Sequence, residues 1–205
     1  MLMKRYLIIA VLASLASLGS ASAQMIAVKS NALYWASSTP NVGLEYAFGD
    51  RWTVELEAGY NPWLLNSQKN MKAKHLLISP EVRYWFCHSF QGHFVGINAN
   101  YVKYNIGALP ISFSDLFINL SPDVPAMPDL TNSRIQGWAL GAGLTYGYSF
   151  PFARRWLLEL TGGLGWWYTA YNQFESRKCG LMQQSVKRHA LGLSTLGVSF
   201  IYMIK

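Results

Sequence analysis

Hydrophobic and polar residues alternate with a period of two along most of this chain. In the segment 42–48 the apolar side chains occupy the even positions, while glycine, glutamate and alanine occupy the odd ones. The same alternation runs through 52–60, 76–86 and 138–148. Successive side chains of a β-strand point to opposite faces, so each segment predicts a strand with one apolar face and one small or polar face.

Weaker alternation at 26–35, 93–104, 156–169 and 190–204 raises the number of predicted strands to eight. A soluble lipocalin-like barrel and a membrane barrel show the same period with opposite faces turned outward. The polar parity favours the membrane barrel, because it is mostly Gly, Ala, Ser, Thr and Asn and too poor in charge to face water. Small side chains also suit the crowded interior of a narrow barrel. The pattern therefore predicts an all-β fold, an eight-stranded antiparallel transmembrane β-barrel.

Composition agrees with an outer face in contact with lipid. The 205 residues are 51% hydrophobic and only 13% charged, whereas an ordinary soluble domain carries about 25% charged residues. Large aromatic residues fall near the predicted strand ends, where the girdles of membrane barrels lie. They are Trp52, Tyr60, Trp63, Trp138, Trp156 and Trp166. A spanning helix over 135–153 is the alternative for that uncharged stretch, but its glycines, its proline and its strict alternation favour a strand.

The first 23 residues have the pattern of a cleaved secretory signal peptide. Lys4 and Arg5 precede the uncharged apolar stretch 6–18, and small residues at 21–23 supply the motif that signal peptidase recognises. An uncleaved anchor helix is the alternative, although the apolar stretch is short for a bilayer. We therefore expect a signal peptide at 1–23, followed by one barrel domain at 24–205 that is exported to the outer membrane.

The lengths of the connections provide an independent check. Outer-membrane barrels have short periplasmic turns and longer external loops, so with periplasmic termini the second, fourth and sixth connections should be short. Six of the seven connections follow this rule, at 49–51, 61–74, 87–92, 105–134, 151–155 and 171–188, whereas the first, 36–39, is too short. The apolar, proline-containing connection 105–134 is expected to fold over the barrel mouth or to contact a partner.

Charged residues on the inward parity predict an ionic network inside the barrel. They are Glu45, Glu55, Glu57, Glu81, Arg83 and Glu159, with Lys29 beside them. Buried charges in a membrane barrel need partners, and a Glu–Arg network supplies them while filling the interior. Acid–base chemistry by paired carboxylates is the alternative. The four histidines show no metal-ligand spacing, and no catalytic residue, metal site or cofactor is predicted.

Two of the long connections are basic. They contain Lys69, Lys72, Lys74, Arg177, Lys178, Lys187 and Arg188. These side chains are candidates for contact with lipopolysaccharide phosphates, and ordinary solubilising charge is the alternative. No basic run is dense enough to predict a nucleic-acid partner. Cys87 and Cys179 are expected at opposite ends of the barrel, too far apart for a disulfide.

Five short stretches together resemble a known family. They are Lys29–Tyr34 (KSNALY), Thr39–Gly43 (TPNVG), Gly59–Trp63 (GYNPW), Pro80–Cys87 (PEVRYWFC) and Gly92–Phe94 (GHF). They are similar to an uncharacterised family of exported Bacteroidetes proteins, domain of unknown function 3575, and the resemblance covers most of the mature chain. It implies an outer-membrane β-barrel, sometimes encoded near fimbrial or surface-adhesin genes, and it implies no activity and no functional residues. The chain departs from the general outer-membrane pattern because it ends in Lys205 rather than in a terminal Phe.

These features lead to one main functional hypothesis and two alternatives. The main hypothesis is a small, non-enzymatic outer-membrane β-barrel with a structural or surface-assembly role through its external loops. Its expected partners are outer-membrane lipid, lipopolysaccharide, the barrel-assembly machinery and surface-adhesin or fimbrial components. The alternatives are an enzyme that modifies lipid A or lipopolysaccharide on the same scaffold, and a soluble periplasmic ligand-binding barrel.

Overall fold

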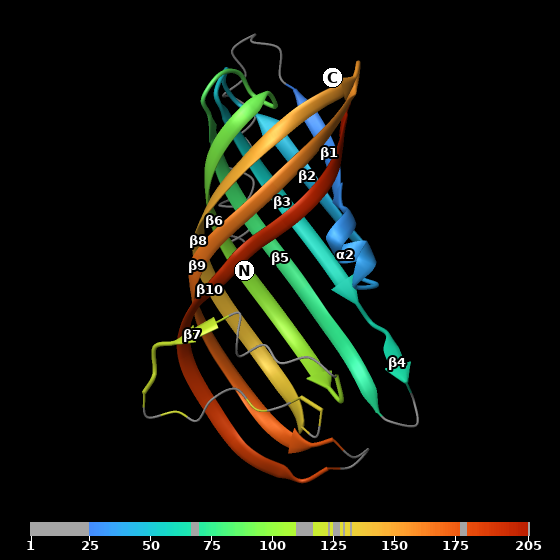
Figure 1. The fold of residues 1–205 in the computed structure, drawn as a ribbon, viewed down its shortest axis with the longest axis vertical. Coiled ribbons are helices and arrows are strands. Elements are labelled where there is room, and N and C mark those ends of the chain that lie inside the picture. The colour runs from blue at the N-terminus through green and yellow to red at the C-terminus, as the bar shows by residue number, and fades with distance from the viewer. Residues whose placement is uncertain are drawn as a thin grey trace, which may run out of the picture.

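Eight strands form one closed antiparallel ring (Figure 1). The computed structural model describes residues 25–66, 70–109, 117–122, 124, 128, 130–131, 133–176 and 180–204. In order around the ring the strands are β1 (Ile26–Asn31), β2 (Asn41–Ala47), β3 (Trp52–Asn61), β5 (Met71–Trp85), β6 (Gly92–Gly107), β8 (Ser133–Ala153), β9 (Trp156–Glu175) and β10 (Met182–Met203). β10 closes the ring by pairing with β1, from Ala27↔Met203 to Asn31↔Ser199. The signal peptide expected at 1–23 lies outside the described residues.

The predicted all-β fold with eight antiparallel strands is confirmed. Each strand of the ring pairs with the next one along the chain, so the ring is a succession of hairpins. The alternative of a helix over 135–153 is wrong, because β8 covers that stretch. No helix in the described part of the chain is long and apolar enough to cross a membrane.

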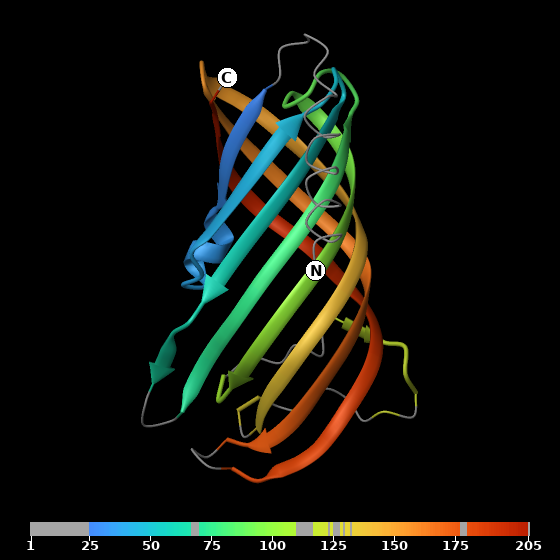
Figure 2. The same cartoon turned by 180° about the vertical axis from the view of Figure 1, so that it is seen from behind.

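The ring is taller on one side than on the other (Figures 1 and 2). Met25 and Ile204 lie together at one end, where the Met25 carbonyl accepts a hydrogen bond from Ala47 and the Ile26 carbonyl accepts one from Ile204. We call this the terminal end. β5, β6, β8, β9 and β10 reach far beyond β1 at the opposite end, which we call the extended end.

The strands at the extended end are longer than the sequence pattern predicted. β5 begins at Met71, β9 continues to Glu175 and β10 begins at Met182, so the third and seventh connections are shorter than expected. Outward positions there are polar, as at Asn105 and Gln136, although the backbone pairing between β6 and β8 continues. The apolar alternation that marked the strands therefore disappears before the strands end.

Two short strands and a helix lie outside the eight-stranded ring. β4 (Leu64–Asn66) pairs with β5. β7 (Phe117–Asn119) belongs to the connection between β6 and β8 and pairs with β10 at Ala190–Gly192. Residues 32–35, which were predicted as the end of the first strand, instead begin helix α2 (Ala32–Ala36). The first connection is therefore longer than expected.

Inward side chains of β6 pass through four layers of the interior. Phe94 belongs to an apolar cluster at the terminal end with Trp85, Phe90, Leu157 and Ile201. Gly96 lies in the second layer, and Asn98 lies in the third. The Asn98 amide donates to Thr145 Oγ1 (2.6 Å) and Thr195 Oγ1 (3.1 Å).

The fourth layer is apolar again and lies at the extended end. Tyr104 and Ile106 of β6 pack there against a cluster of Leu109, Leu130, Ile135, Tyr171 and Val186. Leu109 and Leu130 come from the connection between β6 and β8, so part of this connection packs into the end of the ring. Side chains of the described residues thus occupy the interior at both ends and in the layers between them.

At the end of β1, the side-chain amides of Asn31 and Asn41 take the place of backbone amides in the hydrogen bonds to the neighbouring strands. Asn41 Oδ1 accepts from Asn31 N (2.6 Å), and Asn41 Nδ2 donates to Asn31 O (3.0 Å). On the other side, Asn31 Nδ2 donates to Leu196 O (3.1 Å) and Asn31 Oδ1 accepts from Val198 N (3.3 Å). Asn31 Oδ1 also accepts from Leu33 N (3.0 Å) and so caps α2. The seam between β1 and β10 is therefore extended by side-chain hydrogen bonds.

Replacing Asn31 with alanine is expected to lower the free energy of unfolding by about 1–3 kcal/mol, because Leu196 O and Val198 N lose their partner where β1 ends. Denaturant unfolding, followed by tryptophan fluorescence, measures this loss. The matched control is Asn172→Ala, since the Asn172 side chain makes no hydrogen bond with any described residue. Equal unfolding midpoints for the two variants would contradict this role of Asn31.

Candidate functional site: an ionic layer inside the ring

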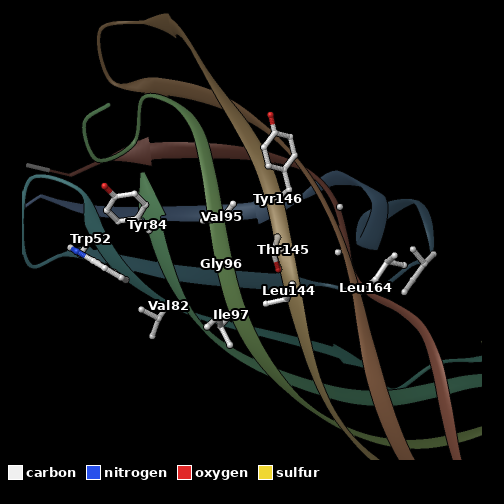
Figure 3. Close-up of a pocket in the computed structure, with 13 residues that line it drawn as sticks. Trp52, Val82, Tyr84, Val95, Gly96, Ile97, Leu144, Thr145, Tyr146 and Leu164 are labelled. Carbon is white, nitrogen blue, oxygen red and sulfur yellow. The ribbon is translucent and has the colours of Figure 1, made fainter. Parts of the chain in front are cut away.

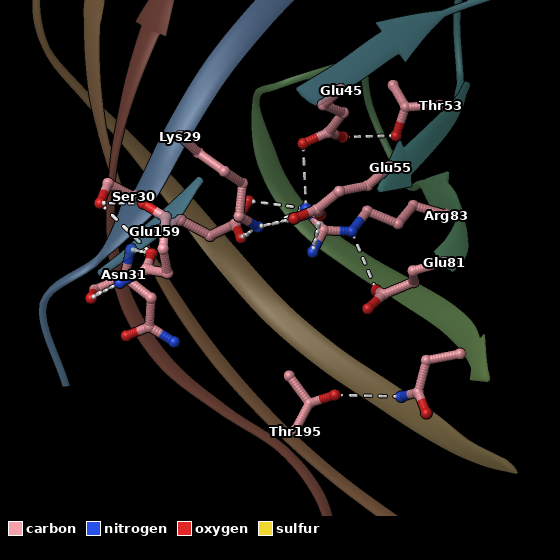
Figure 4. A network of polar contacts seen from close by, with 12 residues as sticks. Lys29, Ser30, Asn31, Glu45, Thr53, Glu55, Glu81, Arg83, Glu159 and Thr195 are labelled. Atoms are coloured by element: carbon pink, nitrogen blue, oxygen red, sulfur yellow. Dashed lines mark hydrogen bonds and ion pairs between the residues drawn. The ribbon is translucent and has the colours of Figure 1, made fainter. Parts of the chain in front are cut away.

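The second interior layer gathers charged side chains from β1, β2, β3, β5 and β9 (Figure 4). Glu45 on β2, Glu55 on β3 and Glu81 on β5 lie side by side, since the register pairs Glu45 with Glu55 and Glu55 with Glu81. Like charges in directly opposed positions repel one another. This row of carboxylates therefore needs cations close by.

Arg83 is the centre of the layer. Its side chain is buried, with Nε donating to Glu81 Oε1 (2.9 Å) and Nη1 donating to Glu45 Oε2 (3.0 Å) and Glu159 Oε2 (3.1 Å). Nη2 forms a further ion pair with Glu55. The guanidinium thus contacts four carboxylates at once, which its fixed fork of five donors makes possible.

Lys29 is the second cation of the layer. Its ammonium contacts Glu55 Oε1 at 2.8 Å and Glu159 Oε1 at 2.8 Å. Both glutamates also contact Arg83, so Lys29 and Arg83 share two carboxylates. The pairing of β10 with β1 and β9 brings Lys29 and Glu159 together although 130 residues separate them.

Neighbouring residues hold the ionic layer in place. Thr53 Oγ1 donates to Glu45 Oε1 (2.5 Å) and accepts from Trp85 Nε1 (3.0 Å), which links the charges to the apolar cluster at the terminal end. Gly96 makes room for Glu81, because a Cβ at this position would lie 2.3 Å from Glu81 Oε1. The Arg83 guanidinium also lies over the Phe94 ring, 4.5 Å from its centroid.

The layer brings together five of the six inward charges that the sequence singled out, and it leaves Glu57 apart. Glu57 is buried on β3, forms no ion pair with a described residue, and its Oε1 accepts no hydrogen bond. Lys29 completes the network. The signal for Lys29 was its position on the inward parity of the first strand.

The layer holds charges in fixed pairs and leaves little room for a substrate. The cavity beside it, lined by Tyr34, Glu57, Ser79 and Asn100 among others, has a volume of about 10 Å³, which is space for a single water. His75 shares the inward parity of β5 with Ser79 and Glu81, which makes it the candidate residue of the enzyme alternative. It is within hydrogen-bond distance of Thr39 Oγ1 (3.3 Å) and Ala73 O (2.8 Å), not of Glu81. Among the described residues, no group of three or more His, Cys, Asp or Glu side chains could hold a metal ion.

The candidate basic residues do not share one surface. Lys72 and Lys74 lie on the outward parity of β5, and Lys187 lies outward on β10. Arg188 points the other way and is buried inside the ring, with its guanidinium 5.6 Å from the centroid of the Tyr171 ring. Lys69, Arg177 and Lys178 lie outside the described residues.

Sequence reasoning did not single out two outward cations near these lysines. Lys103 lies on β6 and Arg134 on β8, and each occupies an outward position near the extended end. Lys103 followed the outward parity of the predicted strand 93–104 and could have been found from it. Arg134 lay at the edge of a predicted loop and carried no such signal.

Cys87 is an exposed free thiol in the connection between β5 and β6 at the terminal end. Cys179, which was expected at the opposite end of the barrel, lies outside the described residues. The expected separation of the two cysteines therefore stays a prediction.

Comparison with known proteins places the chain in a family without assigning a role to any of these residues. No curated protein matches the sequence significantly. The sequence does match the family described as "Protein of unknown function (DUF3575)" over residues 7–204, which is nearly the whole chain. The chain therefore belongs to the DUF3575 family.

Proposed function

We propose that this protein is a non-enzymatic outer-membrane β-barrel whose eight strands span the bilayer. Its role is structural or in surface assembly, through the connections at the extended end. The observation that carries the proposal is the inverted distribution of polarity. The ionic layer lies inside the ring, while large apolar side chains cover the outside.

The outward apolar surface is continuous across neighbouring strands. Ile97 on β6, Leu144 on β8 and Leu164 on β9 occupy one row of the register, and they are 67%, 68% and 68% exposed. Burying such a side chain stabilises a protein by about 1.5–3 kcal/mol, so a row left in water would forgo that stabilisation. Contact with lipid acyl chains would explain why these apolar side chains lie on the outside of the ring.

A shallow groove of about 730 Å³ follows this row on the outside of the ring (Figure 3). Apolar and aromatic side chains such as Val82, Val95 and Tyr146 line it, and Gly162 leaves an open position among them. None of the lining residues is charged. This surface suits the irregular packing of acyl chains.

Aromatic side chains flank the apolar surface on both sides. Towards the terminal end they are Phe48, Trp52, Tyr84, Phe86, Tyr148, Phe150, Trp156 and Tyr202, and towards the extended end they are Tyr60, Trp63, Tyr101, Trp138, Trp166 and Tyr168. Along β8, ten residues separate Trp138 from Tyr148, which at about 3.3 Å per residue and a tilt of about 40° gives a height of about 25 Å. This matches the apolar band of outer-membrane barrels.

Cell fractionation tests the proposed location. The full-length chain, expressed in its native host, is expected in the outer-membrane pellet after carbonate extraction, and to migrate faster on gels when unheated than when boiled. Recovery in the soluble periplasm would contradict the proposal and favour a ligand-binding barrel. A changed lipid A mass spectrum in cells that carry His75→Ala, with the barrel still folded, would favour an enzyme.

A further inference from the structure

The register brings four outward cations together on three adjacent strands at the extended end. Lys72 on β5 pairs with Gly107 on β6, and Gly107 pairs with Arg134 on β8. Lys74 lies one outward position further along β5. Lys103 lies diagonally across from Lys74, because its register partner is Leu76. We call Lys72, Lys74, Lys103 and Arg134 the basic cluster.

Gly107 lets Arg134 lie close to the β6 backbone. Gly107 is buried between Lys72 and Arg134, and a Cβ there would lie 2.9 Å from Arg134 Cβ. The Arg134 guanidinium lies over the ring of Phe174, 4.4 Å from its centroid, which holds it against the outer surface. Lys72 and Arg134 are therefore neighbours on the outer wall, with no side chain between them.

No carboxylate of the described residues forms an ion pair with a cation of the cluster. All the ion pairs formed between described residues involve Lys29 or Arg83 inside the ring. Lys74 and Lys103 are exposed, and Lys72 and Arg134 are half-buried. The cluster is a concentration of positive charge on the outer wall.

The position of the cluster indicates the kind of anion it binds. Lys103 pairs across the register with Trp138, and Tyr101 lies one outward position closer to the apolar surface. Trp and Tyr side chains gather at the headgroup level of a bilayer. Lysine and arginine just beyond them lie at the depth of lipid phosphates, with which they form charge-assisted hydrogen bonds.

We propose that the basic cluster binds the phosphate of a membrane lipid headgroup, with the acyl chains of that lipid lying along the apolar wall beneath. The inference rests on the proposed function, because it requires the wall to be in a membrane. It adds a defined site on β5, β6 and β8. Compared with the basic residues predicted from the sequence, the site adds Lys103 and Arg134 and does not include the buried Arg188.

Native mass spectrometry of the mature chain in uncharged detergent tests the site. Phosphatidic acid is compared with diacylglycerol of the same acyl chains, so the two probes differ only in the phosphate. The wild-type chain is expected to bind phosphatidic acid at least about tenfold more tightly, because two or more charge-assisted contacts are gained. Lys72→Gln combined with Arg134→Gln is expected to reduce this preference to less than about threefold.

Two further variants keep the test specific. Arg154→Gln with Arg155→Gln removes the same number of positive charges at the terminal end, where both arginines are exposed, and it is expected to keep the preference. Lys72→Arg with Arg134→Lys keeps the charges and is expected to keep most of the preference. Gel migration before and after boiling checks that each variant is folded.

Three results would overturn the inference. They are an equal affinity of the wild-type chain for both lipids, a preference that survives in the Lys72→Gln/Arg134→Gln variant, and displacement of phosphatidic acid by equimolar inorganic phosphate, which would identify a free-phosphate site. Membrane location is measured separately by fractionation. A chain that sediments with the outer membrane but shows no phosphate preference therefore contradicts this inference alone.

Discussion

Replacing Arg83 with methionine is expected to lower the free energy of unfolding by about 3–5 kcal/mol, the cost of removing one partner from a buried ion pair. Arg83 contacts Glu45, Glu55, Glu81 and Glu159. Without the guanidinium, Glu45 and Glu81 have no cation, and only Lys29 remains for the other two. Methionine fills a similar volume, so the loss reports charge rather than an empty cavity.

Equilibrium unfolding in urea, with the chain in phospholipid vesicles, measures the effect of Arg83→Met. Buried Trp85 lies beside the layer and is hydrogen-bonded to Thr53, so tryptophan fluorescence responds to its opening. The matched control, Arg154→Met, removes an exposed arginine at the terminal end and is expected to change stability by no more than about 0.5 kcal/mol.

Partial rescue distinguishes the ionic network from simple packing. Adding Glu45→Gln and Glu81→Gln to Arg83→Met removes the two carboxylates that lost their cation. The triple variant is therefore expected to be more stable than Arg83→Met alone, which is a non-additive result. A triple variant less stable than Arg83→Met would show that these glutamates stabilise the fold independently of Arg83.

Replacing Leu164 with arginine is expected to cost about 2–4 kcal/mol if the row of Ile97, Leu144 and Leu164 lies at the bilayer midplane. In a water-soluble protein, a substitution at so exposed a surface position changes stability by no more than about 0.5 kcal/mol. The loss of stability in this variant is therefore expected to be large under the membrane proposal and small under the soluble-barrel alternative.

Folding into vesicles, measured as the fraction of the chain that migrates faster without boiling, provides the readout for Leu164→Arg. Gln136→Arg is the matched control, because Gln136 is exposed and faces outward on β8 beyond Trp138, towards the extended end. Near the interface an arginine costs only about 0–1 kcal/mol. If both variants fold equally well and remain soluble without detergent, the membrane proposal is wrong.

Local regularity explains how much of the fold could be predicted. β2, β3 and the middle of β8 alternate apolar with small or polar residues without interruption. β2 and β3 were predicted within one residue of their observed bounds, whereas the predicted strand 138–148 covers only the middle of β8. α2 was missed because Ala32–Ala36 continues an apolar pattern, and the cap that ends β1 depends on Asn41, Leu196 and Val198. These partners meet only when the ring closes.

The sequence by itself determined which residues of a strand share a face, because the period of two is a property of each strand alone. The composition of the two faces then indicated which of them is inward and which residues could carry the interior charge. The sequence also placed Glu45, Glu55, Glu81 and Arg83 on a common inward parity.

The tertiary structure decided how these residues are partnered. The closure of β1 onto β10 brings Lys29 to Glu159, whereas Glu57 stays outside the network. The register irregularity between Leu193 and Thr195 changes the inward parity of β10 and places Arg188 inside the ring. The register of β5, β6 and β8 groups Lys72 and Lys103 with Arg134. Register depends on pairing between distant segments, and a shift by one residue would move every side chain to the other face. The alternation of one strand carries no information about its register with the next.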